Sequence, residues 1–168
     1  MSSPVYRILL SLLFSFLALP ALAGNPKCYK GSAPLPSAGE VREVAQLFDR
    51  WNAALATDNP RNVVELYAPH AVLLPTISNQ VRSSHAEIYD YFKKFMELKP
   101  KGEVNYRKTH LIDENNAVDA GVYTFTLTNK DGSKRNLQAR YTFVYSKRAG
   151  EWKIIHHHSS TMPEGGCF

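Results

Sequence analysis

The hydrophobic pattern changes its period once along the chain, from the spacing of helices to the alternation of strands. Before residue 104, apolar residues recur at helical spacing in a segment that begins at Ser37, a short segment after Asn59 and a segment that follows Ser84. Beyond that point apolar and polar positions alternate, which predicts strands over 104–112, 117–128, 137–147 and 151–160. Helices followed by a run of strands indicate an α+β fold.

Polar residues mark where the three helices begin. Ser37 and Ser84 are each followed three residues later by a glutamate, which is the pattern of a capping box. Asn59 precedes Pro60, which suits the cap and first position of the short second helix. A short apolar run over 71–74 predicts one further strand between the second and third helices.

Turn residues separate the later strands at 113–116, 129–133 and 148–150. The strands are therefore expected to form a curved, mostly antiparallel sheet that wraps the three helices and leaves a pocket between the two layers. The sheet has aromatic residues on both of its expected faces. One face should meet the helices, and the other should meet a second subunit.

The first 23 residues have the pattern of a secretory signal. Arg7 supplies the positive start, an apolar run follows over 8–19, and the small residues of 21–23 predict cleavage before Gly24. A retained membrane anchor is the alternative, but the apolar run is shorter than the roughly 20 residues of a span. We therefore expect a periplasmic or secreted protein without a stable membrane anchor.

Charge argues against a nucleic-acid partner. The 20 Lys and Arg exceed the 15 Asp and Glu, for a net charge of +5, but the two signs are interspersed. The sequence has no basic helix, no glycine-rich phosphate loop, and neither the GxSxG nor the HExxH motif. No cofactor is predicted.

Two cysteines, Cys28 and Cys167, lie at opposite ends of the expected mature chain. Export predicts a disulfide between them, with a metal pair or two free thiols as alternatives. The expected organisation is an extended arm over 24–36, a folded domain over 37–162, and a tail over 163–168.

The order of these elements resembles the nuclear transport factor 2-like fold, a cone-shaped α+β barrel. The resemblance is greater to the association, or hub, domain of calcium/calmodulin-dependent protein kinase II and its stand-alone bacterial relatives. The residues that carry it are Tyr91-Phe92, His110-Leu111 and the run GEWKIIHHH over 150–158, which is similar to the family's Gly-x-Trp-x-Ile-Val-His-x-His strand. The similarity covers about 40–160.

The resemblance implies a cone fold, a deep pocket, and a homodimer or larger ring formed through the sheet. Hub domains assemble kinases and are not catalytic, and this chain has no kinase domain, so a kinase partner is not implied. The family's pocket is lined by arginines, but the matching positions here are Tyr123, Phe143 and Ser159. The resemblance therefore does not extend anion binding to this pocket.

Strand alternation places one set of reactive residues on a single face. His157 is expected to face the same cavity as Tyr123, Tyr141 and Phe143, and Asp119 shares the parity of Tyr123. His157, Asp119 and Tyr123 are the predicted acid-base residues of a catalytic site. The alternative is an aromatic core that contains a hydrogen-bonded histidine and a strand-end aspartate near solvent.

Two further residues complete the expected ligand pocket. Ser159 has the parity of His157, and Arg82 lies in the loop before the third helix, where a pocket mouth is expected. The alternative for Arg82 is a solvated surface position.

His156 and His158 are predicted on the opposite face, roughly 6.5–7 Å apart along the strand. Two imidazoles at this spacing could bind zinc or copper if His110, Asp119 or Glu164 supplied a third ligand. The alternative is that both histidines lie at a subunit interface.

Arg140, His110 and Trp152 are assigned structural or interface roles. A buried Arg140 would need an anion such as Asp119 or Glu65 beside it. Two functions follow from the whole pattern. The first is an exported, self-associating hub-like domain with a small-molecule pocket, and the alternative is a small isomerase, hydrolase or dehydratase.

Overall fold

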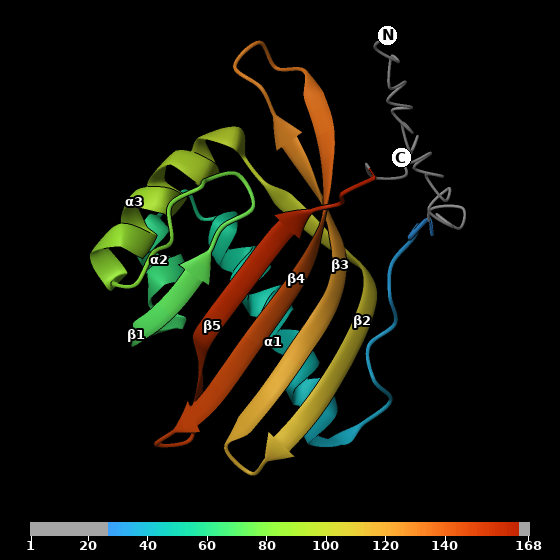
Figure 1. Ribbon diagram of the computed structural model, residues 1–168, viewed down its shortest axis with the longest axis vertical. Helices are drawn as coiled ribbons and strands as arrows, with labels where there is room; N and C mark the ends of the chain where they lie inside the picture. Colours follow the sequence, from blue (N-terminus) through green and yellow to red (C-terminus); the bar gives the residue numbers. More distant parts are fainter. Residues whose placement is uncertain (1–26, 165–168) are drawn as a thin grey trace, which may run out of the picture.

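The computed structural model describes residues 27–164, which form one five-stranded sheet with helices on one of its faces (Figure 1). The helical elements are α1 (Gly39–Leu55), α2 (Pro60–Val64), α3 (His85–Phe95) and the 3-10 helix η1 (Met96–Leu98). The strands are β1 (Tyr67–Leu74), β2 (Lys101–Asp113), β3 (Asn116–Thr128), β4 (Lys134–Arg148) and β5 (Glu151–Thr161). The predicted α+β class is confirmed. The predicted signal segment, 1–23, lies outside the described residues. Within 27–164, no helix has the length and apolar character needed to cross a membrane.

The strands lie in the order β1-β5-β4-β3-β2. The four long strands are antiparallel, and β1 pairs with β5 in parallel at the sheet edge. Strands β2 and β4 each begin three residues before the predicted start, and β1 begins at Tyr67 rather than at residue 71. Pro69 lies within β1, where the ladder to β5 is irregular between Tyr67 and Val72, so its missing N–H breaks no regular pairing.

The predicted caps of the second and third helices are confirmed. Asn59 Oδ1 accepts a hydrogen bond from the Arg61 N–H at 3.1 Å at the start of α2. At the start of α3, Ser84 Oγ accepts from the Glu87 N–H at 3.3 Å, and Glu87 Oε2 accepts from the Ser83 N–H at 2.8 Å. These side chains satisfy N–H groups that a helix leaves unpaired at its first turn.

The predicted cap of the first helix is wrong. The helix begins at Gly39, and its cap position, Ala38, is extended and makes no side-chain cap bond. The Glu40 carboxylate, expected to close a capping box with Ser37, instead lies 3.4 Å from Lys147 Nζ on β4. A tertiary ion pair thus replaces the local hydrogen bond.

A bulge in β5 reverses its side-chain alternation. The pairing with β4 skips Ile155, so buried positions fall at Trp152 and Ile154 before the bulge and at His157 and Ser159 after it. Regular alternation would place His157 on the same face as Ile155, but the extra residue shifts the phase by one and places it on the face of Ile154. The side chain of Ile155 is only half-buried.

A second bulge leaves Asn105 on β2 without a partner on β3. Beside it, Gly121 is required by a close approach, because a Cβ there would lie 1.9 Å from the Tyr106 carbonyl oxygen. The missing side chain at Gly121 leaves no room for a ligand, because the β2 backbone occupies that space. After the bulge, Arg107 pairs with Gly121 and its side chain is buried.

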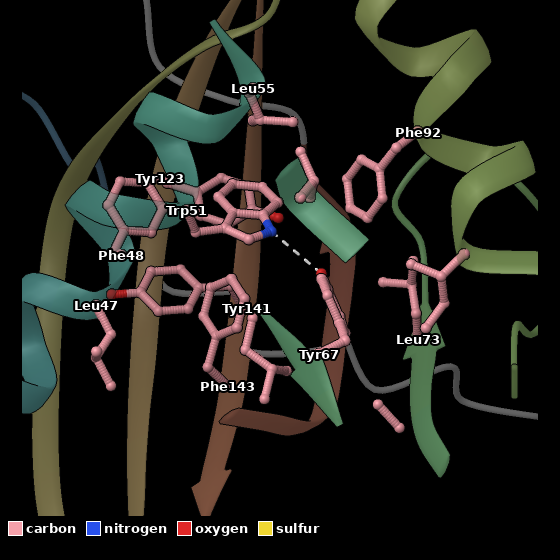
Figure 2. Close-up of a cluster of buried hydrophobic side chains, with 14 of the residues drawn as sticks. Leu47, Phe48, Trp51, Leu55, Tyr67, Leu73, Phe92, Tyr123, Tyr141 and Phe143 are labelled. Carbon is pink, nitrogen blue, oxygen red and sulfur yellow. Dashed lines mark hydrogen bonds between the residues drawn. The ribbon is translucent and has the colours of Figure 1, made fainter. Parts of the chain in front are cut away.

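An aromatic core fills the space between the helices and the sheet (Figure 2). In that core Trp51 Nε1 donates a hydrogen bond to Tyr67 Oη at 3.1 Å. The helical faces predicted from periodicity are buried, with Leu47 in the core and Val41 only half-buried. The largest fully buried side chains are Trp51, Tyr67, Tyr123, Tyr145, Phe48, Phe92, Phe125 and Phe143.

The described part of the arm, 27–36, contains no helix or strand and runs beside β2 (Figure 1). The Ala33 N–H donates to the Val104 carbonyl at 2.7 Å, and Gln138 Nε2 donates to the Tyr29 carbonyl at 2.9 Å. The sheet face turned away from the helices is called the outer face below. Within 27–164, no helix covers it.

Candidate functional site

The predicted acid and base lie in one row across the inner face of the sheet. Asp119 on β3 pairs with Phe143 on β4, which pairs with His157 on β5. Two strand spacings separate the backbones of Asp119 and His157 by roughly 10 Å. The Phe143 ring lies between them and stacks on the imidazole, with ring centroids 4.0 Å apart. The two groups therefore share a face, as predicted, but belong to separate hydrogen-bond clusters.

Asp119 is completely buried and holds three polar neighbours. Thr109 Oγ1 donates to one carboxylate oxygen at 2.9 Å, and Tyr141 Oη donates to the other at 3.2 Å. Arg107 Nε lies 3.4 Å from the second oxygen. Burial raises the pKa of Asp119 to about 6, although Arg107 and both hydroxyl donors oppose the rise.

Arg107 was not identified from the sequence. Its side chain is 5% exposed, and neither Nε nor Nη2 has a hydrogen-bond partner within 27–164. Its guanidinium carbon lies 5.9 Å from the centre of the Phe48 ring. Counting back from the Asp113–Asn116 pair would match Thr109 with Ala120, but an irregularity between Leu111 and Asp113 shifts the register by one residue and pairs Thr109 with Asp119. The position of Arg107 near this carboxylate therefore depends on strand irregularities that the hairpin turn does not reveal.

His157 forms the second cluster with Tyr67 and Trp51, which lie on other elements and could not be identified from the alternation along β5. Tyr67 Oη accepts from Trp51 Nε1 at 3.1 Å (Figure 2). The same oxygen lies 2.8 Å from His157 Nδ1. The other ring nitrogen of His157, Nε2, is buried and has no hydrogen-bond partner within 27–164. Burial lowers the pKa of His157 to about 3, so the ring is neutral at neutral pH.

A chain of hydroxyls joins Tyr123 to the loop after β1. Tyr123 Oη donates to Ser159 Oγ, which also forms a short hydrogen bond with Thr76 Oγ1. Burial raises the pKa of Tyr123 to about 12, so this phenol remains protonated. The ring stacks on Tyr141 with centroids 5.0 Å apart. Of the predicted acid-base residues, Tyr123 contacts neither Asp119 nor His157 by hydrogen bond.

The space at the centre of the predicted pocket is small. A void of about 10 Å³, lined by His157, Ser159, Tyr123 and aromatic residues of α1 and α3, has room for about one water. Tyr141 and Phe143 are packed in the core beside it. The deep hollow implied by the family resemblance is filled here by aromatic side chains.

Roomier pockets lie at the periphery. One of about 270 Å³ lies between α1 and β2 with the arm as its outer wall, and Arg107 is part of its lining. Two more, of about 470 and 410 Å³, lie near the end of α1 and between α2 and α3. The first pocket is named the arm pocket below, because it alone of the three borders a buried polar cluster described above.

Arg82 lies in the loop before α3, as predicted, and forms a backbone bridge with Leu73. Arg82 Nη2 is 3.4 Å from Ser78 Oγ, while its buried Nε has no partner within 27–164. Its positive charge acts to lower the pKa of Tyr91, against a larger rise from burial. Arg82 is thus close to the α3 side of the core rather than to Asp119.

His156 and His158 both lie on the outer face, as predicted. His110 is in the same cross-strand row as His156 but three strand spacings away, about 14 Å, and Asp119 is on the inner face. No group of three or more potential metal ligands gathers among residues 27–164. The zinc or copper prediction therefore needs a ligand from outside residues 27–164.

The residues assigned to structure or interface divide between the two faces. Arg140 is exposed on the outer face, where Nη2 donates to Ser160 Oγ at 3.1 Å, so no buried anion is required. His110 is also exposed there. Trp152 is buried in the core, and Lys147 Nζ lies 5.2 Å from the centre of its ring.

Cys28 lies on the described part of the arm, whereas Cys167 lies outside the described residues. Their predicted pairing stays a prediction.

The sequence matches the profile of the calcium/calmodulin dependent protein kinase II association domain over residues 40–163. A crystal structure from Xanthomonas campestris, described as such an association domain, is 62% identical, with 83% of this chain and 99% of that chain covered and a TM-score of 0.82. No curated protein matches significantly.

More distant structures are similar in fold alone. The association domain of the C. elegans kinase is 15% identical, with 71% of this chain and 94% of that chain covered and a TM-score of 0.59. A ketosteroid isomerase-like protein from Erwinia carotovora atroseptica is 16% identical, with coverage of 73% and 96% and a TM-score of 0.63. At these identities, the shared fold says nothing of a shared reaction.

Proposed function

Because the chain belongs to the calcium/calmodulin-dependent protein kinase II association-domain family, we propose that it is an exported domain that associates with copies of itself and binds a small molecule. The leader-like first 23 residues support export to the periplasm or beyond. The outer face supports association, and the arm pocket supports ligand binding.

The outer face carries the argument for association. At its centre, small and β-branched side chains from neighbouring strands are half-buried: Val118 pairs with Val144, and Ala120 pairs with Thr142. A sheet face of this kind is stabilised when a second surface covers it. Among residues 27–164 the helices pack against the opposite face (Figure 1), and we propose another molecule as the covering surface.

A second copy is the occupant that fits this face best. The central side chains of Val118, Val144, Ala120 and Thr142 are uncharged, and the cations Lys108 and Arg140 flank them, so two identical faces meet over this centre in an arrangement that keeps these cations apart. His156 lies in the same row as Val118 and Val144, and His158 lies beside Thr142. Two copies would bring two such histidine pairs near one interface, which is where a metal with ligands from both chains would lie.

Light scattering of the mature chain, from Gly24 on, tests association. We expect a dimer or larger ring, and we expect Val118→Lys and Val144→Lys to lower the molar mass because a buried ammonium at the interface is unfavourable. Gln46→Lys is the matched control, since it adds the same charge on an exposed position of α1. A wild-type chain that is monomeric at high concentration would contradict the proposal. Equal molar masses in solution for Val118→Lys, Val144→Lys and the control Gln46→Lys would also contradict it.

A small acid-base enzyme is the second candidate, and the raised pKa of Asp119 beside Tyr141 favours it. This function needs a substrate within reach of the carboxylate. Asp119 is fully buried, and both of its oxygens already accept hydrogen bonds. These contacts support binding rather than turnover as the first proposal.

A further inference from the structure

The arm pocket has one wall from each of three parts of the chain. The arm contributes Ala33 and Leu35, α1 contributes Phe48, and β2 contributes Val104 and Arg107. Its volume is about 270 Å³. Ala33, Leu35, Phe48 and Val104 form an apolar part of a lining that is otherwise polar or charged, so the pocket suits a compact ligand with one apolar portion and charged groups.

Arg107 is the polar anchor of this lining. The guanidinium is always charged, its side chain is 5% exposed, and Nη2 has no hydrogen-bond partner within 27–164. A buried cation with an unpaired donor is unfavourable unless an acceptor is supplied. The carboxylate is the acceptor whose geometry best matches a guanidinium.

Asp119 does not meet that need. Its two oxygens already accept from Thr109 and Tyr141, and its contact with Arg107 is a single 3.4 Å approach to Nε. Nη2 is left without an acceptor. Arg107 is part of the pocket lining, so a ligand in the pocket is placed to supply an acceptor to its guanidinium.

Two exposed acids, Asp49 and Glu103, belong to the same lining. They repel a ligand that carries only negative charge and attract one that also carries an ammonium group. Asn52 also lines the pocket, where its amide group donates to the Gly102 carbonyl and accepts from the Gly102 N–H, both at 2.9 Å. Glu103 Oε1 accepts a hydrogen bond from Ser32 Oγ of the arm. The charged groups of the lining are thus one buried cation and two rim acids.

We propose that the arm pocket binds a small apolar amino acid, with its carboxylate on Arg107, its ammonium group toward Asp49 and Glu103, and its side chain against Phe48 and Leu35. This inference rests on the ligand-binding half of the proposed function and names the ligand class. It is independent of association, because the pocket lies between α1 and β2 and the outer face lies elsewhere.

Isothermal titration calorimetry of the full mature chain with three probes tests this assignment. Leucine carries both charged groups, 4-methylpentanoate lacks the ammonium group, and 3-methylbutylamine lacks the carboxylate. We expect saturable binding of leucine and at least about tenfold weaker binding of the other two. A folded chain that binds no leucine, or that binds 4-methylpentanoate as tightly, would overturn the proposal.

Variants assign the two ends of the ligand. Arg107→Gln should weaken the binding of leucine by at least about tenfold, and Arg107→Lys should lose less affinity because it keeps the positive charge. The double variant Asp49→Asn, Glu103→Gln should bind leucine more weakly. It should bind 4-methylpentanoate more tightly, because the two rim acids no longer repel a ligand that carries only negative charge. The rim substitutions are at exposed positions, so they keep the test valid if Arg107→Gln does not fold. Rim variants that leave both affinities unchanged would refute the ammonium contact.

Light scattering on the same samples separates this inference from the proposed association. A monomer that binds leucine contradicts association alone, and an oligomer that ignores leucine contradicts the amino-acid site alone.

Discussion

Asp119 and His157 give the same core opposite pH dependences. The folded state raises the pKa of Asp119 from 3.8 to about 6, so it holds a proton that the unfolded chain releases. The stability from this group is present in acid and is lost as the pH rises from about 4 to 6. For His157 the folded pKa falls from 6.5 to about 3, so its stability is present above pH 6.5 and is lost on acidification.

We expect these two slopes, each about 3 kcal/mol between pH 4 and 6.5, to oppose each other in the wild type. Asp119→Asn should expose the histidine slope, so that the variant loses stability on acidification. His157→Asn should do the reverse and gain stability between pH 6 and 4. Urea unfolding at several pH values measures the slopes, which matter here rather than the absolute stabilities. If the free energy of unfolding changed with pH in the same way for the wild type and both variants, the pH dependence could not be assigned to Asp119 and His157.

At the scale of the element, two serines of similar sequence context have different roles. Ser84 Oγ caps α3, whereas Ser37 makes no cap because α1 begins at Gly39 after an extended Ala38. We expect Ser84→Ala to reduce the free energy of unfolding by about 1 kcal/mol. Ser37→Ala is the matched control and should change it by less than about 0.5 kcal/mol. Chemical denaturation measures both, and equal losses would show that the two caps are equivalent.

Bulges in two strands decide which side chains reach the inner face of the sheet. The bulge at Ile155 moves His157 into phase with Ile154, and the bulge at Asn105 moves Arg107 to the inner face. Each bulge is a single extra residue, yet each decides which side chains meet the core. The arm pocket exists because Arg107 is buried there.

At the scale of the whole molecule, the predicted Cys28–Cys167 bridge would tie the arm to the other end of the chain. Closing so long a loop is worth about 4 kcal/mol in the chain-entropy model. We expect reductant to lower the free energy of unfolding of the mature wild type by a large part of that amount. Cys28→Ser should be destabilised to a similar degree and should not respond to reductant.

Peptide mass mapping under non-reducing conditions identifies the pair directly. A wild type whose stability is unaffected by reductant, or peptides that link neither cysteine to the other, would contradict the predicted bridge.

Sequence periodicity by itself determined the class of fold, the order of the elements and the faces of the helices. The caps at Asn59 and Ser84 and the three hairpin turns were also predictable, because each depends on residues that are neighbours along the chain. The inward direction of Asp119 agrees with strand alternation. His157 was also predicted to face inward, but in the structure its direction depends on the bulge at Ile155, which alternation does not encode.

Only the tertiary structure decided which of those groups touch. Tyr67 reaches His157 through the parallel pairing of β1 with β5, and Phe143 separates His157 from Asp119. The burial of Arg107 depends on a bulge and on the arm, which lie far apart in sequence. Periodicity fixes the direction of a side chain from its neighbours in the chain, whereas contacts between strands depend on register and on single extra residues, which the pattern does not encode.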